Sequence, residues 1–212
     1  MIDPYLLPLT RKLLHGPAAV LVKLGITANQ VTIGGFIIGM LALPALAMQW
    51  YGPALVFILL NRLSDGLDGA VARQTKMSDA GGFLDIVLDF IFYNAVVVGF
   101  FLADPGQNAM AAVLLLFSFA GTGSSFLAFA SVAAKYGLSN VNYPNKSLHY
   151  MGGLTEGFET IAVFVAFCLW PQHFVILAYV FAGACWITTL TRLRLGYLTL
   201  TKQASTQARE QI

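Results

Sequence analysis

The stretch that decides the fold spans residues 53–103 and reads PALVFILLNRLSDGLDGAVARQTKMSDAGGFLDIVLDFIFYNAVVVGFFLA. It contains two apolar runs, 53–74 and 80–103, each long enough to cross a hydrocarbon core of about 30 Å as a helix. Each run also carries two aspartates. An ionised side chain at membrane depth costs at least about 2.5 kcal/mol on insertion scales, so these aspartates are first interpreted as functional.

The rest of the chain has the same apolar character. Of its 212 residues, 58% are hydrophobic and 10% are charged. Soluble domains contain about 25% charged residues, so this composition excludes a soluble globular enzyme and a disordered tail protein. The continuous runs exclude a porin-like barrel, whose strands would alternate apolar and polar residues. The net charge of +2 is too small to indicate a nucleic-acid partner.

Six apolar spans are predicted, and they make the chain, 1–212, a single membrane domain. Before them, in residues 1–28, prolines and basic residues interrupt leucines and valines, which is typical of an interfacial amphipathic helix. We therefore expect an all-α integral membrane protein: an interfacial helix, a six-helix bundle over 30–197 and a cytoplasmic tail over 198–212. The six spans are 30–50, 53–74, 80–103, 108–133, 153–170 and 172–197.

The basic residues predict the orientation, because they favour cytoplasmic loops. Most of them lie before the first span, around the connection between the second and third, between the fourth and fifth, and with or after the sixth. The connections 49–53, 104–108 and 170–173 contain no Lys or Arg. Both termini are therefore expected on the cytoplasmic side, and we expect a bacterial inner (cytoplasmic) membrane.

The four aspartates are expected to form one layer. Asp65 and Asp68 share a helix face with Arg73, and Asp85 and Asp89 share a face of the next span. In an antiparallel hairpin of these spans, Asp65 lies at the depth of Asp89, and Asp68 at that of Asp85. Four carboxylates repel one another at low dielectric, and Arg73 can offset only one of them. Oxygen-only ligands favour Mg²⁺ or Mn²⁺ over zinc, so we predict two such ions, approached from the cytoplasm.

Two glycines belong to the same acidic faces. Gly69 follows Asp68 directly, and Gly81 lies four residues before Asp85. A glycine there leaves room for a ligand that a side chain would block. Close packing of helices through small residues would give the same pattern, so both interpretations stay open.

Together these residues resemble the signature of the CDP-alcohol phosphotransferase (CDP-alcohol phosphatidyltransferase) family of integral membrane phospholipid-synthesis enzymes. The signature is D-x2-D-G-x2-A-R-x7-8-G-x3-D-x3-D. It is matched by Asp65, Asp68, Gly69, Ala72, Arg73, Gly81, Asp85 and Asp89. The resemblance implies Mg²⁺-dependent transfer of a phosphatidyl-type group from a CDP-linked lipid, such as CDP-diacylglycerol, to an alcohol, with release of CMP. It also implies a homodimer, for which the small-residue run 120–125 offers a surface.

The resemblance assigns roles to the matching positions. Asp65, Asp68, Asp85 and Asp89 would hold the metal ions, and Asp89 would also be the general base for the acceptor hydroxyl. The residues implied in binding the CDP and diphosphate are Asn29, Thr32, Asp68, Gly69, Ala72, Arg73 and Gly81.

The segment with Asn29 and Thr32 looks like the family's Pro-Asn-x-x-Thr, although Ala28 replaces the proline. Helix capping by Thr27 or Asn29 is the alternative role for this segment.

The acceptor is left open by the sequence. Phosphatidylglycerophosphate synthases of the family typically have a proline and a lysine where this chain has Ile86 and Phe90, which disfavours glycerol 3-phosphate. A second polar cluster is predicted to bind the acceptor, and its members are Lys135, Lys146, His149, Glu156, Glu159 and Arg192. The two glutamates could bind an amine or sugar hydroxyls, or they could pair with basic side chains and tie down the loop. The basic residues could equally form a phosphate pocket for a phosphorylated polyol.

Two other classes of membrane protein also place acids inside the membrane. An intramembrane prenyltransferase also uses Asp-x-x-Asp and Mg²⁺ on a lipid diphosphate, but it would need more helices and a second Asp-rich motif in the later half. A cation transporter using intramembrane carboxylates would normally show repeats and discontinuous helices near the midplane. The acids here open to one side only, which favours the phosphatidyltransferase.

Overall fold

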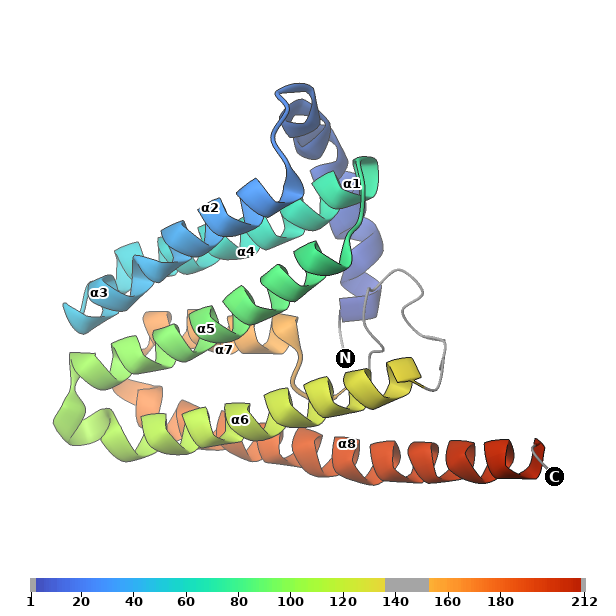
Figure 1. The fold of residues 1–212 in the computed structure, drawn as a ribbon. Coiled ribbons are helices and arrows are strands. Elements are labelled where there is room, and N and C mark those ends of the chain that lie inside the picture. The colour runs from blue at the N-terminus through green and yellow to red at the C-terminus, as the bar shows by residue number, and fades with distance from the viewer. Residues whose placement is uncertain (1–2, 136–152, 211–212) are drawn as a thin grey trace.

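The computed structural model describes residues 3–135 and 153–210, and within these ranges all regular structure is helical (Figure 1). The predicted all-α class is therefore confirmed. The elements are α1 (Asp3–Lys23), α2 (Ala28–Met40), α3 (Ala42–Ala47), α4 (Tyr51–Gln74), α5 (Asp79–Ala103), α6 (Pro105–Lys135), α7 (Gly157–Leu169), the short 3-10 turn η1 (Pro171–His173) and α8 (Phe174–Glu210).

Four of the described segments are long and apolar enough to span a membrane: Ala28–Ala47, Asp79–Ala103, Pro105–Lys135 and Pro171–Lys202. Helix α4 has 24 residues, about 36 Å at 1.5 Å each, but it carries the charges of the motif. Helix α7 is apolar and has only 13 residues. The count of six crossings remains a prediction.

The helix boundaries differ from the predicted spans at two places. The first span is broken at Leu41 into α2 and α3, because Pro44 has no amide hydrogen to donate and its ring crowds the carbonyl of Met40 one turn earlier. The last span, expected to end at residue 197, continues as one helix to Glu210, through most of the expected tail. The other boundaries lie within a few residues of the prediction.

Helices α2 and α4 lie side by side (Figure 1), and glycines let them approach closely. A Cβ atom at Gly35 would collide with the Cβ of Ser64, and one at Gly39 would lie 2.8 Å from the Cβ of Asn61. The Asn61 side chain instead donates a hydrogen bond to the Gly35 carbonyl, at 3.2 Å. Backbones this close allow side chains of α2 to reach the polar face of α4.

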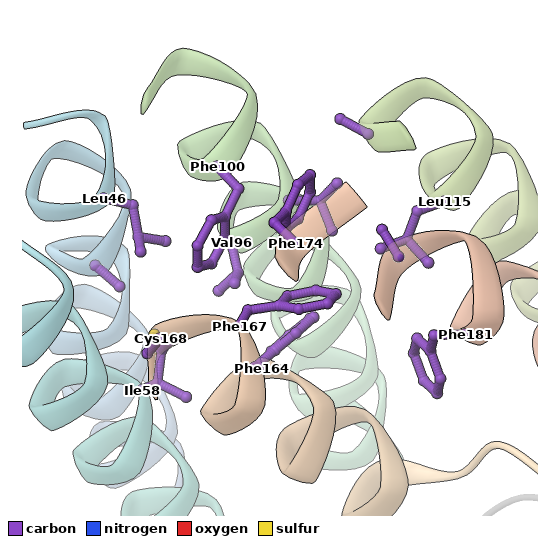
Figure 2. Packing of buried hydrophobic residues seen from close by; sticks show 14 of the residues in the cluster. Leu46, Ile58, Val96, Phe100, Leu115, Phe164, Phe167, Cys168, Phe174 and Phe181 are labelled. Atoms are coloured by element: carbon purple, nitrogen blue, oxygen red, sulfur yellow. The ribbon is translucent and has the colours of Figure 1, made fainter. Parts of the chain in front are cut away.

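Aromatic side chains near the end of α5, the end of α7 and the start of α8 pack together in the core (Figure 2). This end of the bundle lies away from the turn between α4 and α5. The rings of Phe100 and Phe174 stack with centroids 4.8 Å apart, and Phe167 meets Phe174 edge-on at the same distance. The two cysteines, Cys168 and Cys185, are free and buried, as the apolar runs around them indicate. This core joins α5, α7 and α8.

The connections without basic residues lie at this same end (Figure 1). The Gln49 side chain, between α3 and α4, donates a hydrogen bond to the Ala103 carbonyl at the end of α5, at 2.8 Å. The basic turn between α4 and α5 lies at the opposite end. The structure thus separates the connections as the charge pattern does.

Helix α1 lies against the C-terminal half of α4 (Figure 1). Ala18 packs on Ala70 and Val71, and Leu14 occupies the space beside Gly66. Gln74 also donates a hydrogen bond to the His15 carbonyl, at 3.0 Å. The predicted interfacial helix therefore supports the motif helix.

Candidate metal and nucleotide site

Three carboxylates of the motif converge between α4 and α5. Asp65 and Asp68 come from α4, and Asp85 comes from α5. One oxygen of each lies within 4.8 Å of the others, and Asp68 is only 7% exposed. The antiparallel hairpin brings them together because their spacings of three and four residues place them on facing stripes.

Asp89 joins the same cleft but has protein partners. Its Oδ1 accepts from Arg62 Nη2 at 3.2 Å, and its Oδ2 accepts from the Tyr93 hydroxyl at 3.4 Å. Arg62 also pairs with Asp65, Nη2 to Oδ1, at 2.6 Å. The contact of one guanidinium nitrogen with both acids places Asp65 and Asp89 at the same level, as expected for the hairpin.

Arg62 is a site residue that the sequence analysis missed. The sequence motif points instead to Arg73 as the neighbouring positive charge. Arg62 lies three residues before Asp65, a spacing at which side chains meet on a helix, so the signal was present. Its guanidinium offsets part of the charge of four carboxylates.

Thr32 connects α2 to this cluster. Its hydroxyl donates a hydrogen bond to Asp68 Oδ2 at 2.6 Å. Helix α2 begins four residues earlier, at Ala28, with Thr27 as N-cap: Thr27 Oγ1 accepts from the Gln30 amide at 3.3 Å, and Gln30 Oε1 accepts from the Thr27 amide at 2.9 Å. This capping box fixes the first turn, so that Thr32 faces α4.

A cleft between α2, α4 and α5 contains the acids. It is lined by Thr32, Gly35, Phe36, Asn61, Ser64, Asp65, Asp68, Asp85, Leu88 and Asp89. Within the described part of the chain, the buried Asn61 Oδ1 atom has no hydrogen-bond partner. An oxygen left in this way beside three carboxylates fits a site for a hard divalent cation, its waters or a polar ligand group.

The remaining nucleotide candidates lie around the ends of α2, α4 and α5. The Arg73 guanidinium covers Gly69: its Nη1 would be 3.2 Å from a Cβ built there. Asn29 Oδ1 would be 3.0 Å from a Cβ at Gly81. At both positions the absence of a side chain leaves room for a neighbouring nucleotide-binding candidate, Arg73 beside Gly69 and Asn29 beside Gly81. Ala72 is partly exposed, close to Arg73 on α4.

The predicted acceptor residues divide into three groups. Lys146 and His149 lie outside the described residues. Lys135 is exposed at the end of α6. The others surround the start of α7, and none of those described lines the acidic cleft.

At the start of α7 the two glutamates form a capping box. Glu156 is 6% exposed, and its Oε1 accepts from the Gly153 amide at 2.9 Å. Glu159 Oε2 accepts from the Glu156 amide at 3.2 Å. Arg192, on α8, is also buried and donates to the Thr122 carbonyl at 3.2 Å. A Cβ at Gly153 would lie 3.3 Å from Arg192 Nη2, so these groups form one cluster.

Comparison with known proteins identifies a family. The family model of the CDP-alcohol phosphatidyltransferases matches residues 25–191. The inner membrane protein YnjF of Escherichia coli is 58% identical over 200 residues, which cover 94% of this chain and 97% of that protein.

Solved structures share the fold. Phosphatidylinositol phosphate synthase of Mycobacterium tuberculosis with CDP-DAG bound superposes with a TM-score of 0.71 at 22% identity, covering 88% of this chain and 94% of that one. The same enzyme in complex with manganese and citrate gives 0.70 at 24% identity, covering 87% and 88%.

Proposed function

The chain belongs to the CDP-alcohol phosphatidyltransferase family, and on this premise we propose that it transfers a phosphatidyl group from CDP-diacylglycerol to an alcohol, releasing CMP. The family makes it an integral membrane transferase of phospholipid biosynthesis. The observation that carries the proposal is the convergence of Asp65, Asp68 and Asp85 in a cleft that Asp89 also lines. Such a cleft suits a diphosphate accompanied by divalent cations.

The metal ions of this proposal are Mg²⁺ or Mn²⁺, two in number, held by Asp65, Asp68, Asp85 and Asp89. The manganese in the related synthase supports this choice. When bound, they would neutralise the diphosphate and stabilise CMP as the leaving group. Thr32 would hold Asp68 in orientation through its 2.6 Å hydrogen bond.

The transfer itself is a displacement at the lipid-bearing phosphorus. The acceptor oxygen forms the new bond to phosphorus, the bond from phosphorus to the CMP oxygen breaks, and CMP leaves with that electron pair. Asp89 would take the proton of the acceptor hydroxyl at a carboxylate oxygen. Arg73, with Asn29 at the mouth of the hairpin, would bind the diphosphate and nucleotide.

The acceptor belongs to the second cluster in this proposal. Arg192 and Lys135 supply positive charge, and Glu156 and Glu159 supply carboxylates, together with Lys146 and His149. An acceptor with a phosphate would use the cations, and an amine would use the acids.

The central experiment measures CMP release by the purified protein in detergent. CDP-diacylglycerol and Mg²⁺ or Mn²⁺ are supplied with each candidate acceptor: serine, glycerol 3-phosphate, inositol phosphate, inositol, choline and diacylglycerol. We expect metal-dependent CMP release with one acceptor class. Asp65→Asn and Asp68→Asn should abolish it while the protein still folds. A folded wild-type protein that releases no CMP with any acceptor, or near-normal activity in either variant, refutes the proposal.

The role of Asp89 needs a separate measurement. If Asp89 is the general base, Asp89→Asn lowers turnover even at saturating concentrations of metal and donor. If Asp89 is only a metal ligand, high Mg²⁺ concentrations fully restore the turnover of the same variant. Turnover across a Mg²⁺ titration, with donor binding followed in parallel, distinguishes these outcomes.

The proposed enzyme is a homodimer with both termini and its active site on the cytoplasmic side. Within the small-residue run of α6, Gly121 faces Thr189 and Trp186 of α8, and Gly123 faces Phe90 of α5. The exposed Ala120 and Ser124 remain for a partner helix. Native mass spectrometry from mild detergent tests the dimer, and labelling of single cysteines at the two ends in intact cells tests the orientation.

A further inference from the structure

Arg62 joins the acids of two helices through one nitrogen atom. Its Nη2 lies 2.6 Å from Asp65 Oδ1 on α4 and 3.2 Å from Asp89 Oδ1 on α5. Its Nη1 donates to the Tyr93 hydroxyl at 2.6 Å. A planar guanidinium with three such partners is held in one orientation.

The surroundings keep this cation at the acids. The Arg62 side chain is 20% exposed, and its Nε is buried with no hydrogen-bond partner in the described ranges. The Tyr93 ring lies alongside, 5.9 Å from the guanidinium carbon. A charge desolvated to this degree is stabilised mainly by the carboxylates that it contacts.

Asp65 consequently has two uses. It contributes an oxygen to the three-carboxylate cluster and also pairs with Arg62. Asp89 has both oxygens within reach of Arg62, at 3.2 and 3.5 Å. Any divalent cation that binds these acids therefore lies near the positive charge of Arg62, which already contacts the same carboxylates.

We propose that Arg62 is a built-in counter-cation for Asp65 and Asp89. When metal is absent, its positive charge offsets the repulsion between these two carboxylates. When a divalent cation binds, Arg62 competes with it for the same carboxylates. Arg62 is thus a positioning residue that lowers the metal affinity of the site. The inference rests on the proposed function for the presence of the metal. It explains how Asp65 and Asp89 can lie at the same level before any ion binds.

The test is Mn²⁺ binding to the full chain in detergent, without substrates, followed by electron paramagnetic resonance of free Mn²⁺. Arg62→Gln removes the charge and keeps a polar side chain. A unit charge roughly 5 Å from a divalent ion weakens binding appreciably even at the dielectric constant of water. Arg62→Gln should therefore bind Mn²⁺ at least about tenfold more tightly than wild type. Arg62→Lys, which keeps the charge, should stay within about threefold of wild type.

Thermal unfolding supplies the second readout. In EDTA, Arg62→Gln should unfold at a lower temperature than wild type, and saturating Mn²⁺ should recover most of the loss. A residue that only packs would lower the unfolding temperature with and without metal and leave Mn²⁺ affinity unchanged or weakened. Either of those results overturns the inference.

A charge-balanced pair covers the case in which Arg62→Gln does not fold. Asp89→Asn removes one negative charge, and the double variant Arg62→Gln with Asp89→Asn has the same net charge as wild type. The double variant should bind Mn²⁺ more tightly than Asp89→Asn alone. Equal affinity in these two variants contradicts the inference.

CMP release separates this inference from the proposed function. In one outcome, the wild-type protein binds Mn²⁺ and releases CMP, and Arg62→Gln binds Mn²⁺ with equal affinity. This result refutes only the counter-cation role of Arg62. In another outcome, neither the wild-type protein nor Arg62→Gln binds Mn²⁺. This result refutes the proposed metal site together with the present inference. Binding only in Arg62→Gln supports the competition in its strongest form.

Discussion

Replacing Gly35 by alanine should disturb the site through the contact between α2 and α4. The new methyl group would collide with the Cβ of Ser64, whereas carbon atoms pack best at about 3.5–4.0 Å. Helix α2 must therefore move away from α4 by about an ångström. Thr32, one turn earlier on α2, would then lose its 2.6 Å hydrogen bond to Asp68.

The size of the effect follows from three contributions. Overpacking costs about 1–3 kcal/mol, and a lost hydrogen bond to a charged group costs about 1.5–3 kcal/mol. Alanine regains about 1 kcal/mol over glycine within a helix. The net loss is roughly 1.5–5 kcal/mol. For a chain of this size that lowers the unfolding temperature by roughly 3–20 °C.

The control is the neighbouring glycine. A Cβ at Gly34 meets nothing within 4 Å, so Gly34→Ala should leave both stability and CMP release near wild type. Thermal unfolding in detergent and CMP release are measured for both variants. If Gly35→Ala behaves like Gly34→Ala in both assays, the close approach of the two helices does not position the site.

Two further predictions concern single hydrogen bonds. Thr32→Val should lower CMP release by about tenfold or more, because Asp68 loses a donor worth roughly 1.5–3 kcal/mol, whereas Thr32→Ser should retain most activity; equal rates for the two variants would refute this role. Glu156→Ala should lower the unfolding temperature by a few degrees, because the start of α7 loses an N-cap worth about 1 kcal/mol, and the KM for the acceptor, measured alongside, shows whether the carboxylate also binds it.

Most of the helical framework could be predicted from the apolar runs. Run length and turn residues placed α4, α5 and α6 within a few residues of their observed ends. The break at Leu41 could have been predicted from Pro44, but the continuous apolar run around it indicates a single helix. The extension of α8 to Glu210 was not available from hydropathy, because a polar helix and a polar tail have the same composition.

The site could be predicted as far as helical spacing reaches. The spacing of the aspartates within each span, together with the hairpin, was enough to group Asp65, Asp68 and Asp85. Which cation faces them was harder to predict. Arg62 and Arg73 both lie on α4 near the acids, and only the side-chain directions show that Arg62 bridges to Asp89. Either Thr27 or Asn29 could be the N-cap of the first span from sequence alone, and the structure shows that it is Thr27.

The described residues that line the acidic cleft lie on α2, α4 and α5, while the buried cluster around Arg192 is formed by α6, α8 and the residues that lead into α7. Substitutions around Arg192 can therefore change that cluster while the residues that line the acidic cleft stay the same. With the acceptor bound by the cluster around Arg192, as we propose, relatives with an intact aspartate signature can diverge in the alcohol they accept. An unchanged signature is consequently strong grounds for inferring the reaction and weak grounds for inferring the product lipid.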